Sequence, residues 1–388
     1  MNIALFTDTC FPQVNGVSNT VDMMVKHLTL LGHHVHLFAP EYSQPQPIYQ
    51  NITTFKSTSL WFYPDMVICH RDDRLVRSVL QQFKPDVIHV MSELTCGWMG
   101  RRAAQELNIP LFTTFTTHIV EYAKLHNVGF LSSIIWKYFK YFHKPARQVL
   151  TPSQVMINEL RQQKIYHASL FQRGVDTSMY HPKYKSTIIN GIDLSQYDTT
   201  FLYVGRLSKE KNIEILLRSF EALCQSLPSS MALFIVGDGP AKSLYQELAN
   251  EHVHFIGFQD KHNLAKWYAS VDAFVFPSMS ETFGNVILEA MASNTIVVGA
   301  KQGGVGCILN NENGIAIDMR SFDELFAIMK HIALKKIKVK SYQNGMQKTL
   351  IKYDWNFVLN QLICKYENSI NLSLGHTKVR HKKHSFDY

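Results

Sequence analysis

The segment AFVFPSMSETFGNVILEAMA, residues 273–292, decides the fold. It begins with the apolar run Ala273–Phe276, passes through a polar turn that contains Gly284, and continues at helical spacing over residues 286–292. A buried strand, a glycine turn and a helix in this order form one unit of a parallel sheet covered by helices. The free N–H groups at the helix start would face the carboxyl edge of the sheet, where ligands bind, and would favour a phosphate.

Units of the same kind repeat along the chain. Short β-branched or aromatic runs alternate with segments whose apolar residues recur at helical spacing, such as residues 17–31, 213–227 and 241–250. The predicted strands are residues 2–6, 34–38, 87–90, 111–114, 148–151, 201–204, 233–236, 254–256, 273–276 and 295–298. We therefore predict an α/β protein with two Rossmann-like, doubly wound parallel-sheet domains.

The polar stretch at about residues 180–200 is predicted to link the two domains. We expect an N-terminal domain at residues 1–180 and a C-terminal domain at residues 181–354. Apolar residues recur at helical spacing within residues 355–374 and predict a terminal helix that packs on another part of the chain. Residues 375–388 are polar and basic, and we expect this tail to be disordered.

Composition narrows the class of protein. The 388 residues are 46% hydrophobic and 18% charged, which excludes disordered and coiled-coil chains. The net charge of +8 favours anionic partners such as phosphorylated substrates or acidic lipids, but it is too small to indicate nucleic acid. The six cysteines lie apart, without metal-ligand spacing, which is typical of a reduced cytoplasmic protein. We expect no signal peptide and no membrane-spanning segment.

Two carboxylates accompany the predicted phosphate site. Glu281 lies in the turn before the helix and Glu289 lies one turn inside it, so both can face one cleft. Beside a phosphate, two acidic groups suggest hydrogen bonds to the hydroxyls of a ribose and a sugar. Alternatively, Glu281 is a capping carboxylate and Glu289 an ordinary surface residue of the helix.

Cations follow the first strand of the C-terminal domain. Gly205 allows a ligand to approach the backbone, while Arg206 and Lys211 place two positive charges at the same carboxyl edge. Such cations can neutralise a diphosphate without a metal ion. The alternative is a solvated surface turn. The next turn contains Gly237 and Asp238, and an ordinary tight turn explains it fully.

The first strand of the N-terminal domain leads into a turn with Asp8, Asn15 and Gly16. The pattern G-x-G-x-x-G is absent there, which argues against a dinucleotide oxidoreductase. Gly16 can still offer backbone N–H groups to a ligand from across a cleft. His118 follows another strand at the same edge, where it is either catalytic or an ordinary structural histidine.

The segment at residues 121–147 is rich in aromatic and basic residues. Its cations are Lys124, Lys137, Lys140, Lys144 and Arg147, against Glu121 alone. A helix with an aromatic face and a basic face could lie on an anionic membrane. Alternatively, its aromatic side chains belong to the core and its lysines face water.

Five segments together resemble the family 4 retaining glycosyltransferases of the GT-B fold. They are Glu281-x7-Glu289, Gly205-Arg206 with Lys211, residues 236–240, Thr7-Asp8 through Gly16-Val17, and Arg173-Gly174-Val175-Asp176. The resemblance spans almost the whole chain and is greatest to bacterial lipid α-mannosyl- and α-glucosyltransferases and to the sulfoquinovosyltransferase type. It implies two domains facing across a cleft and a C-terminal helix that crosses back to the N-terminal domain.

The resemblance also implies the roles of individual residues. Glu289 would hold the ribose, Glu281 the donor sugar, and Arg206 and Lys211 the diphosphate of a UDP- or GDP-sugar. The remaining donor-binding residues would be Gly16, Gly205, Gly237, Asp238, Phe283, Gly284, Asn285 and Val286, the acceptor-binding residues Asp8, Asn15, His118 and Tyr122, and the catalytic residues Arg206, Lys211, Glu281 and His118. The reaction would retain the anomeric configuration and use neither a metal ion nor a cofactor.

The chain departs from the family pattern in two places. Where many relatives carry a His-Thr pair, this chain has Thr116-Thr117, with His118 two positions further along the same face of an extended strand. After Gly303-Gly304 the chain continues with Val305 instead of an acidic residue, which suggests an altered donor-sugar pocket.

The leading hypothesis is transfer of a hexose to a lipid, lipid-linked or other glycan acceptor at the cytosolic membrane face. The alternatives are a nucleotide-sugar epimerase of the same fold and a non-catalytic protein that binds sugar nucleotides. These motifs leave open the base, the sugar, the acceptor and the oligomeric state.

Overall fold

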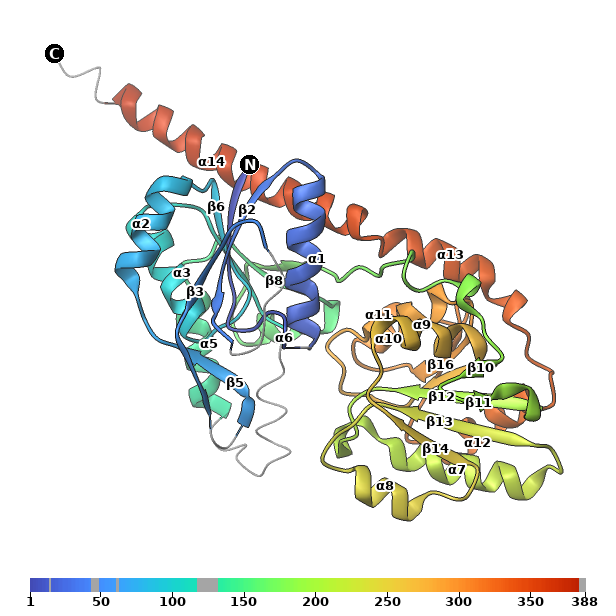
Figure 1. Cartoon of the computed structure of the whole chain (residues 1–388). Coiled ribbons are helices and arrows are strands. Elements are labelled where there is room, and N and C mark those ends of the chain that lie inside the picture. Colours follow the sequence, from blue (N-terminus) through green and yellow to red (C-terminus); the bar gives the residue numbers. More distant parts are fainter. Residues whose placement is uncertain (14, 43–48, 61–62, 117–131, 384–388) are drawn as a thin grey trace. The chain divides into compact units, whose positions relative to one another are not determined.

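The computed structural model describes residues 1–13, 15–42, 49–60, 63–116 and 132–383, and it divides into two compact units (Figure 1). The N-terminal unit comprises Met1–Phe171 and Val358–Tyr388, and the C-terminal unit comprises Gln172–Phe357. Each unit contains its own parallel sheet with helices packed on it. The prediction of two Rossmann-like α/β domains is therefore confirmed.

The sheet of the N-terminal unit has seven strands in the order β3-β2-β1-β6-β7-β8-β9, and all its pairs are parallel. The strands are β1 (Asn2–Phe6), β2 (His34–Pro40), β3 (Ile52–Phe55), β6 (Val87–Val90), β7 (Leu111–Thr114), β8 (Gln148–Thr151) and β9 (Ala168–Leu170). The helices packed on this sheet are α1 (Gly16–Leu30), α2 (Asp73–Phe83), α3 (Thr95–Glu106), α5 (Ser132–His143) and α6 (Gln154–Gln162). Strands β4 (Ser57–Leu60) and β5 (Tyr63–Cys69) form a separate antiparallel pair.

The sheet of the C-terminal unit has six parallel strands in the order β14-β13-β12-β15-β16-β17. The strands are β12 (Thr199–Val204), β13 (Met231–Val236), β14 (Val253–Gly257), β15 (Ala273–Phe276), β16 (Ile296–Ala300) and β17 (Ile315–Ile317). The helices are α7 (Ile213–Ser226), α8 (Lys242–Leu248), α9 (Lys261–Ser270), α10 (Asn285–Ala292), α11 (Val305–Ile308), α12 (Phe322–Ala333) and α13 (Gln343–Lys352). Every residue of β12, β13 and β15 is buried, as both faces of the sheet are covered.

The strand order places the candidate site. Strand β12 lies between β13 and β15, so the chain first adds β13 and β14 on one side of β12 and then adds β15 onward on its other side. At such a reversal the loops that follow the two neighbouring strands diverge and leave room at the carboxyl ends. The loops in question are residues 205–212 after β12 and residues 277–284 after β15. These are the two loops that carry the predicted cations and carboxylates.

The boundary between the units differs from the predicted linker at residues 180–200. The chain enters the C-terminal unit at Gln172, and Val175, Tyr180 and Leu194 are buried in the core of that unit. The short strands β10 (Ile188–Ile189) and β11 (Ile192–Asp193) form a hairpin there. The polar composition of this segment reflects its exposed turns, whereas a few well-spaced apolar side chains anchor it.

Helix α14 (Trp355–Lys383) begins in the C-terminal unit and continues in the N-terminal unit (Figure 1). The fully buried Tyr366 hydroxyl lies 2.5 Å from Nδ1 of His89, and its ring meets the edge of Phe112 with 4.8 Å between ring centroids. Residues 375–383 were expected to be disordered but extend this helix, which contains no proline to interrupt it. Within the described ranges, no helix is both long and apolar enough to cross a bilayer.

Candidate functional site

The two loops beyond the reversal in strand order meet through an ion pair. Lys211 Nζ lies 2.5 Å from Glu281 Oε1, and the two side chains are 16% and 19% exposed. Lys211 ends the short 3-10 helix that follows β12, while Glu281 belongs to the loop that follows β15. The structure therefore brings together two residues seventy positions apart that the sequence assigned to one site.

Arg206 lies in the same loop as Lys211, and its side chain is exposed. The Tyr203 hydroxyl donates a hydrogen bond to the Arg206 carbonyl oxygen at 3.1 Å, and the Tyr203 ring stacks on Phe276 of β15. Because Tyr203 is fully buried, this bond fixes the backbone that carries Arg206. The side chain of Arg206 is therefore presented from a rigid base at the carboxyl edge.

Glycines let the loop after β12 pack directly on the loop after β13. Gly237 has φ +130°, and a Cβ atom on it would lie 2.0 Å from the Gly205 carbonyl oxygen. A Cβ on Gly239 would lie 2.4 Å from the Leu207 carbonyl oxygen. Leu207 N–H donates to the Asp238 carbonyl oxygen at 2.9 Å. Gly237 therefore lets the loop after β13 pack on the loop that carries Arg206. The sequence pattern of a tight turn did not indicate this structural role.

The Asp238 side chain is engaged within its own turn. It accepts a hydrogen bond from Gly239 N–H at 2.8 Å and pairs with Lys242 Nζ at 2.9 Å. These contacts, with the Lys242 bond as the largest cause, hold the pKa of Asp238 below its usual value. Asp238 therefore stabilises the start of α8, and its predicted role in donor binding stays a prediction.

A second pair of glycines supports residues 277–284, which contain Glu281 and form the carboxylate loop. Gly304 N–H donates to the Glu281 carbonyl oxygen at 2.7 Å. A Cβ on Gly304 would lie 2.4 Å from Phe283 N, and a Cβ on Gly303, which has φ +65°, would lie 2.5 Å from the Met279 carbonyl oxygen. Val305 begins helix α11 and packs beside Gly284. The departure from the family pattern after Gly303-Gly304 thus leaves this supporting contact intact.

Helix α10 begins directly after that loop. Gly284 takes up a left-handed conformation, φ +99°, as its N-cap. Phe283 is buried against the Tyr353 ring at 5.7 Å, and Val286 is half-buried. Within the described part of the chain, the buried Oδ1 of Asn285 has no hydrogen-bond partner. The first turn of α10 therefore combines free backbone N–H groups with one unused acceptor.

Glu289 lies one turn further along α10, where it is not an ordinary surface residue. The Tyr268 hydroxyl donates to Glu289 Oε2 at 3.0 Å, and the Tyr180 hydroxyl hydrogen-bonds the same carboxylate. Burial raises the pKa of Glu289 to about 7, although the two tyrosines and Lys261 favour its ionised form. A pKa shifted this far in a site of this kind is typical of functional residues.

Arg173 begins one of the five segments that resemble the family. It is half-buried in the C-terminal unit, and burial lowers the pKa of its guanidinium to about 10, while the nearby Glu281 carboxylate opposes this shift. The next residue, Gly174, packs so closely on Trp355 that a Cβ would lie 2.5 Å from its ring. Arg173 is therefore, with Lys211, a second cation near Glu281, and it is held on a fixed backbone.

The predicted acceptor residues of the N-terminal unit have structural partners. Asp8 is 4% exposed, and its carboxylate accepts from Ser92 Oγ and Cys96 N at 2.6 Å, together with the Leu94 and Gly97 N–H groups. Burial raises the pKa of Asp8, and these hydrogen bonds oppose the rise. Asp8 thus anchors the start of α3, and its predicted contact with an acceptor stays a prediction.

Asn15 caps helix α1, because its side chain accepts from the Val17 and Ser18 N–H groups at 2.9 Å each. Gly16 is the first residue of that helix and is exposed, as a contact with phosphate requires. His118 and Tyr122 lie outside the described residues.

Comparison with known proteins identifies two family models along the chain. Residues 14–179 match "Glycosyltransferase Family 4" and residues 185–348 match "Glycosyl transferases group 1". A GDP-mannose-dependent alpha-mannosyltransferase of Corynebacterium glutamicum is 29% identical over 96% of this chain and 90% of its own length. A sulfoquinovosyl transferase of Arabidopsis thaliana is 26% identical over 91% of this chain and 71% of its own. An alpha-monoglucosyldiacylglycerol synthase of Streptococcus pneumoniae is 27% identical over 77% and 70%.

Solved structures share the fold. Sucrose-phosphate synthase from Thermosynechococcus elongatus superposes with a TM-score of 0.74 at 20% identity, covering 95% of this chain and 98% of that chain. The Anabaena protein HepE in complex with UDP gives a TM-score of 0.73 at 18% identity, covering 95% and 100%. The family models, the relatives and the fold agree with the motifs at the carboxyl edge. The chain belongs to the family 4 glycosyltransferases and has their GT-B fold.

Proposed function

We propose that this glycosyltransferase moves a hexose from a UDP- or GDP-sugar to a lipid, lipid-linked or glycan acceptor at the cytosolic membrane face, with retention of the anomeric configuration. The observation that carries the proposal is the Lys211–Glu281 pair at 2.5 Å, in the loops where the strand order reverses. Relatives whose names contain GDP-mannose and the UDP complex of HepE support both classes of donor.

The family resemblance supports the proposed roles of the individual residues. Glu289 accepts hydrogen bonds from the ribose hydroxyls, and Glu281 accepts from the donor sugar. Arg206 and Lys211 stabilise the negative charge that develops on the departing diphosphate, and Gly16 is proposed as a further phosphate ligand. These cations supply the charge that a metal ion would otherwise provide, so no metal ion or cofactor is required.

The chemical step exchanges one bond for another at the anomeric carbon. The bond from C1 of the sugar to the phosphate oxygen breaks, and a bond from C1 to the acceptor oxygen forms on the same face. The departing phosphate takes the proton of the acceptor hydroxyl, so charge and protons balance. His118, Tyr122 and Asn15 are proposed to hold the acceptor.

Nucleotide-sugar binding tests the donor assignment. We expect one of UDP-glucose, UDP-galactose, GDP-mannose and UDP-sulfoquinovose to raise the melting temperature, because a ligand that binds only the folded state stabilises it. At a ligand concentration of about 100 Kd, the stabilisation is about 2.7 kcal/mol. Differential scanning fluorimetry measures the shift, with glucose and mannose alone as controls. If no donor changed the melting temperature of the protein alone, both the transferase and the epimerase would lose support. Formation of a sugar product without any acceptor would favour the epimerase.

Helix α5 provides a surface for the proposed membrane contact. Ile134 is 62% exposed and Tyr141 61%, and Lys137, Lys140 and Lys144 project from the same exposed side or directly after it. Of the segment predicted to be basic and aromatic, residues 121–131 lie outside the described residues. Helix α5 itself contains no acidic residue. The described helix thus offers apolar and cationic groups to one anionic surface.

The opposite side of α5 belongs to the core. The helix therefore has both features that the sequence offered as alternatives, aromatic side chains in the core and an exposed side with cations. Phe139 and Phe142 are buried, and Arg101 of α3 donates from Nε to the Phe142 carbonyl oxygen at 2.9 Å. The Arg101 guanidinium also lies 4.7 Å from the Trp98 ring centroid and 5.0 Å from that of Tyr141. The exposed side is therefore presented by a firmly anchored helix.

Charge reversal on α5 tests the membrane contact. Replacing Lys137, Lys140 and Lys144 with Glu should weaken binding to phosphatidylglycerol-containing vesicles by about 100-fold or more, since each cation contributes about 1 kcal/mol near an anionic surface. Sedimentation with vesicles measures the bound fraction. The matched control replaces the exposed Lys336, Lys338 and Lys340 of the C-terminal unit with Glu. Equal sedimentation of the α5 variant and the parent would contradict the assignment.

A further inference from the structure

Two tyrosines from separate segments converge on Glu289. Tyr268 lies on α9 and donates to Glu289 Oε2 at 3.0 Å, while Tyr180 approaches from the segment that enters the C-terminal unit. Tyr268 is fully buried and Tyr180 is 7% exposed, and their rings meet edge to face with 5.8 Å between centroids. Neither hydroxyl was recognised from the sequence, because nothing in the spacing of residues 180, 268 and 289 connects them.

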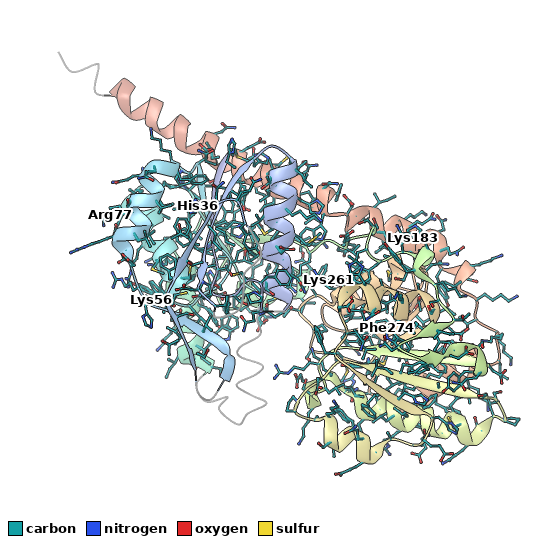
Figure 2. The ribbon with its side chains drawn as sticks, viewed as in Figure 1. His36, Lys56, Arg77, Lys183, Lys261 and Phe274 are labelled. Atoms are coloured by element: carbon teal, nitrogen blue, oxygen red, sulfur yellow. The ribbon has the colours of Figure 1, made fainter. Side chains whose placement is uncertain are left out.

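The surroundings determine the charge of this carboxylate. Among the described residues, the ionisable groups that act on Glu289 are Tyr268 and Lys261 of α9, where Lys261 is the first residue of the helix (Figure 2), and Tyr180. Burial opposes ionisation and is the largest influence, while the two hydroxyls and the Lys261 ammonium favour it. The folded protein therefore holds Glu289 near the balance between its neutral and ionised forms at neutral pH.

Ionisation matters because a ribose diol presents two donors. An ionised carboxylate is an acceptor only, with two oxygens available, whereas a neutral carboxylic acid carries a hydrogen of its own. The Tyr268 bond occupies one side of Oε2 and fixes the plane of the carboxylate. Because the plane is already fixed, the carboxylate can accept hydrogen bonds from both ribose hydroxyls without losing further side-chain conformational entropy.

We propose that Tyr268 and Tyr180 are positioning residues for nucleotide capture, which orient Glu289 and favour its ionised, acceptor form that binds the 2′- and 3′-hydroxyls of the donor nucleotide. The proposal rests on the proposed role of Glu289 as the ribose ligand. It adds that the affinity for the nucleotide rises with pH as Glu289 ionises, and that the two tyrosine hydroxyls determine at which pH this happens.

The experiment compares two ligands that differ only in the diol. The Kd values of GDP and 2′,3′-dideoxy-GDP are measured by isothermal titration from about pH 5.5 to about pH 8.5, and the UDP pair is measured in parallel. Because both members of a pair carry the same phosphates, the ratio of their Kd values removes the titration of the phosphate. In the parent protein, the preference for the ribonucleotide should rise about tenfold or more with pH, with its midpoint near the Glu289 pKa of about 7.

Two variants then test the tyrosines separately. In Tyr268→Phe the midpoint should move upward by about one pH unit, because a hydrogen bond that favours the carboxylate is lost. Tyr180→Phe should move it in the same direction, and it serves as an independent test if Tyr268→Phe does not fold. The control is Tyr197→Phe, which loses a hydroxyl of the same unit that lies 3.2 Å from His254 Nε2.

The outcomes separate this inference from the proposed function. An unchanged midpoint in both tyrosine variants, or an equal movement in Tyr197→Phe, would overturn the role of Tyr268 and Tyr180 while leaving the transferase intact. A preference for the ribonucleotide that does not vary with pH in the parent would overturn it as well. Failure of GDP and UDP to bind at any pH would instead overturn the proposed function on which the inference rests.

Discussion

Replacing Lys211 with alanine should lower the turnover of hexose transfer by about 100-fold or more while leaving the protein folded. Lys211 is one of the cations held at the carboxyl edge, 2.5 Å from Glu281 and only 16% exposed. In such a partly desolvated position, a positive charge stabilises a departing diphosphate far more than it would in water. Arg206→Ala should act in the same direction, since its side chain extends from the same loop.

The measurement is kcat with saturating donor, combined with thermal unfolding of each variant. The effect on folding should be smaller than the effect on turnover, because Arg206 is exposed and neither side chain belongs to the hydrophobic core. Lys209→Ala is the matched control, since Lys209 is an exposed cation of the same turn without the Glu281 contact. Parent-like turnover in both Arg206→Ala and Lys211→Ala would remove the basis for leaving-group stabilisation by these residues.

Gly304→Ala is the second change with a large expected effect. The added Cβ would lie 2.4 Å from Phe283 N and from Thr282 C, so the backbone of the carboxylate loop must move. Overpacking of this kind costs about 1–3 kcal/mol of stability. Because Gly304 N–H holds the Glu281 carbonyl at 2.7 Å, the movement also displaces Glu281, and a displacement of about 1 Å can cost about 100-fold in rate.

Urea unfolding and steady-state kinetics measure the two effects of Gly304→Ala separately. The control is Gly191→Ala, because a Cβ on Gly191 meets nothing within 4 Å, although its φ of +80° still adds backbone strain. The control should therefore lose some stability but keep its turnover. If Gly304→Ala retained both the stability and the turnover of the parent, the close approach between these loops would have no functional consequence.

The strands that lie deep in both sheets could be predicted from the sequence, because burial on both faces makes them continuous apolar runs. Strands β1, β6, β7, β8 and β15 have the predicted bounds. Strand β3, which pairs only with β2, was missed, since three of its four residues are only half-buried and two are threonines. An edge strand of this kind carries no apolar run to recognise.

The charged residues of the candidate site could be predicted from the sequence, but the contacts that hold them in place could not. Arg206, Lys211 and Glu281 each follow a strand that was recognised, so their common edge could be inferred from topology. The contact of Gly304 with the Glu281 loop and the tyrosine contacts of Glu289 arise only when distant segments pack together. The contacts of Asp8 with the start of α3 could not be predicted for the same reason, because the sequence does not show which backbone N–H groups lie beside this carboxylate.

The division of the chain determines the order in which its parts can be completed during synthesis. The C-terminal unit is one uninterrupted stretch, Gln172–Phe357, whereas the N-terminal unit needs Val358 onwards, including the Tyr366 that meets His89 and Phe112. The part of the chain made first is therefore the last to be finished. Until α14 has emerged from the ribosome, the His89 imidazole and the Phe112 ring have no tyrosine to cover them. Premature termination near residue 357 would therefore damage the N-terminal unit and spare the C-terminal unit.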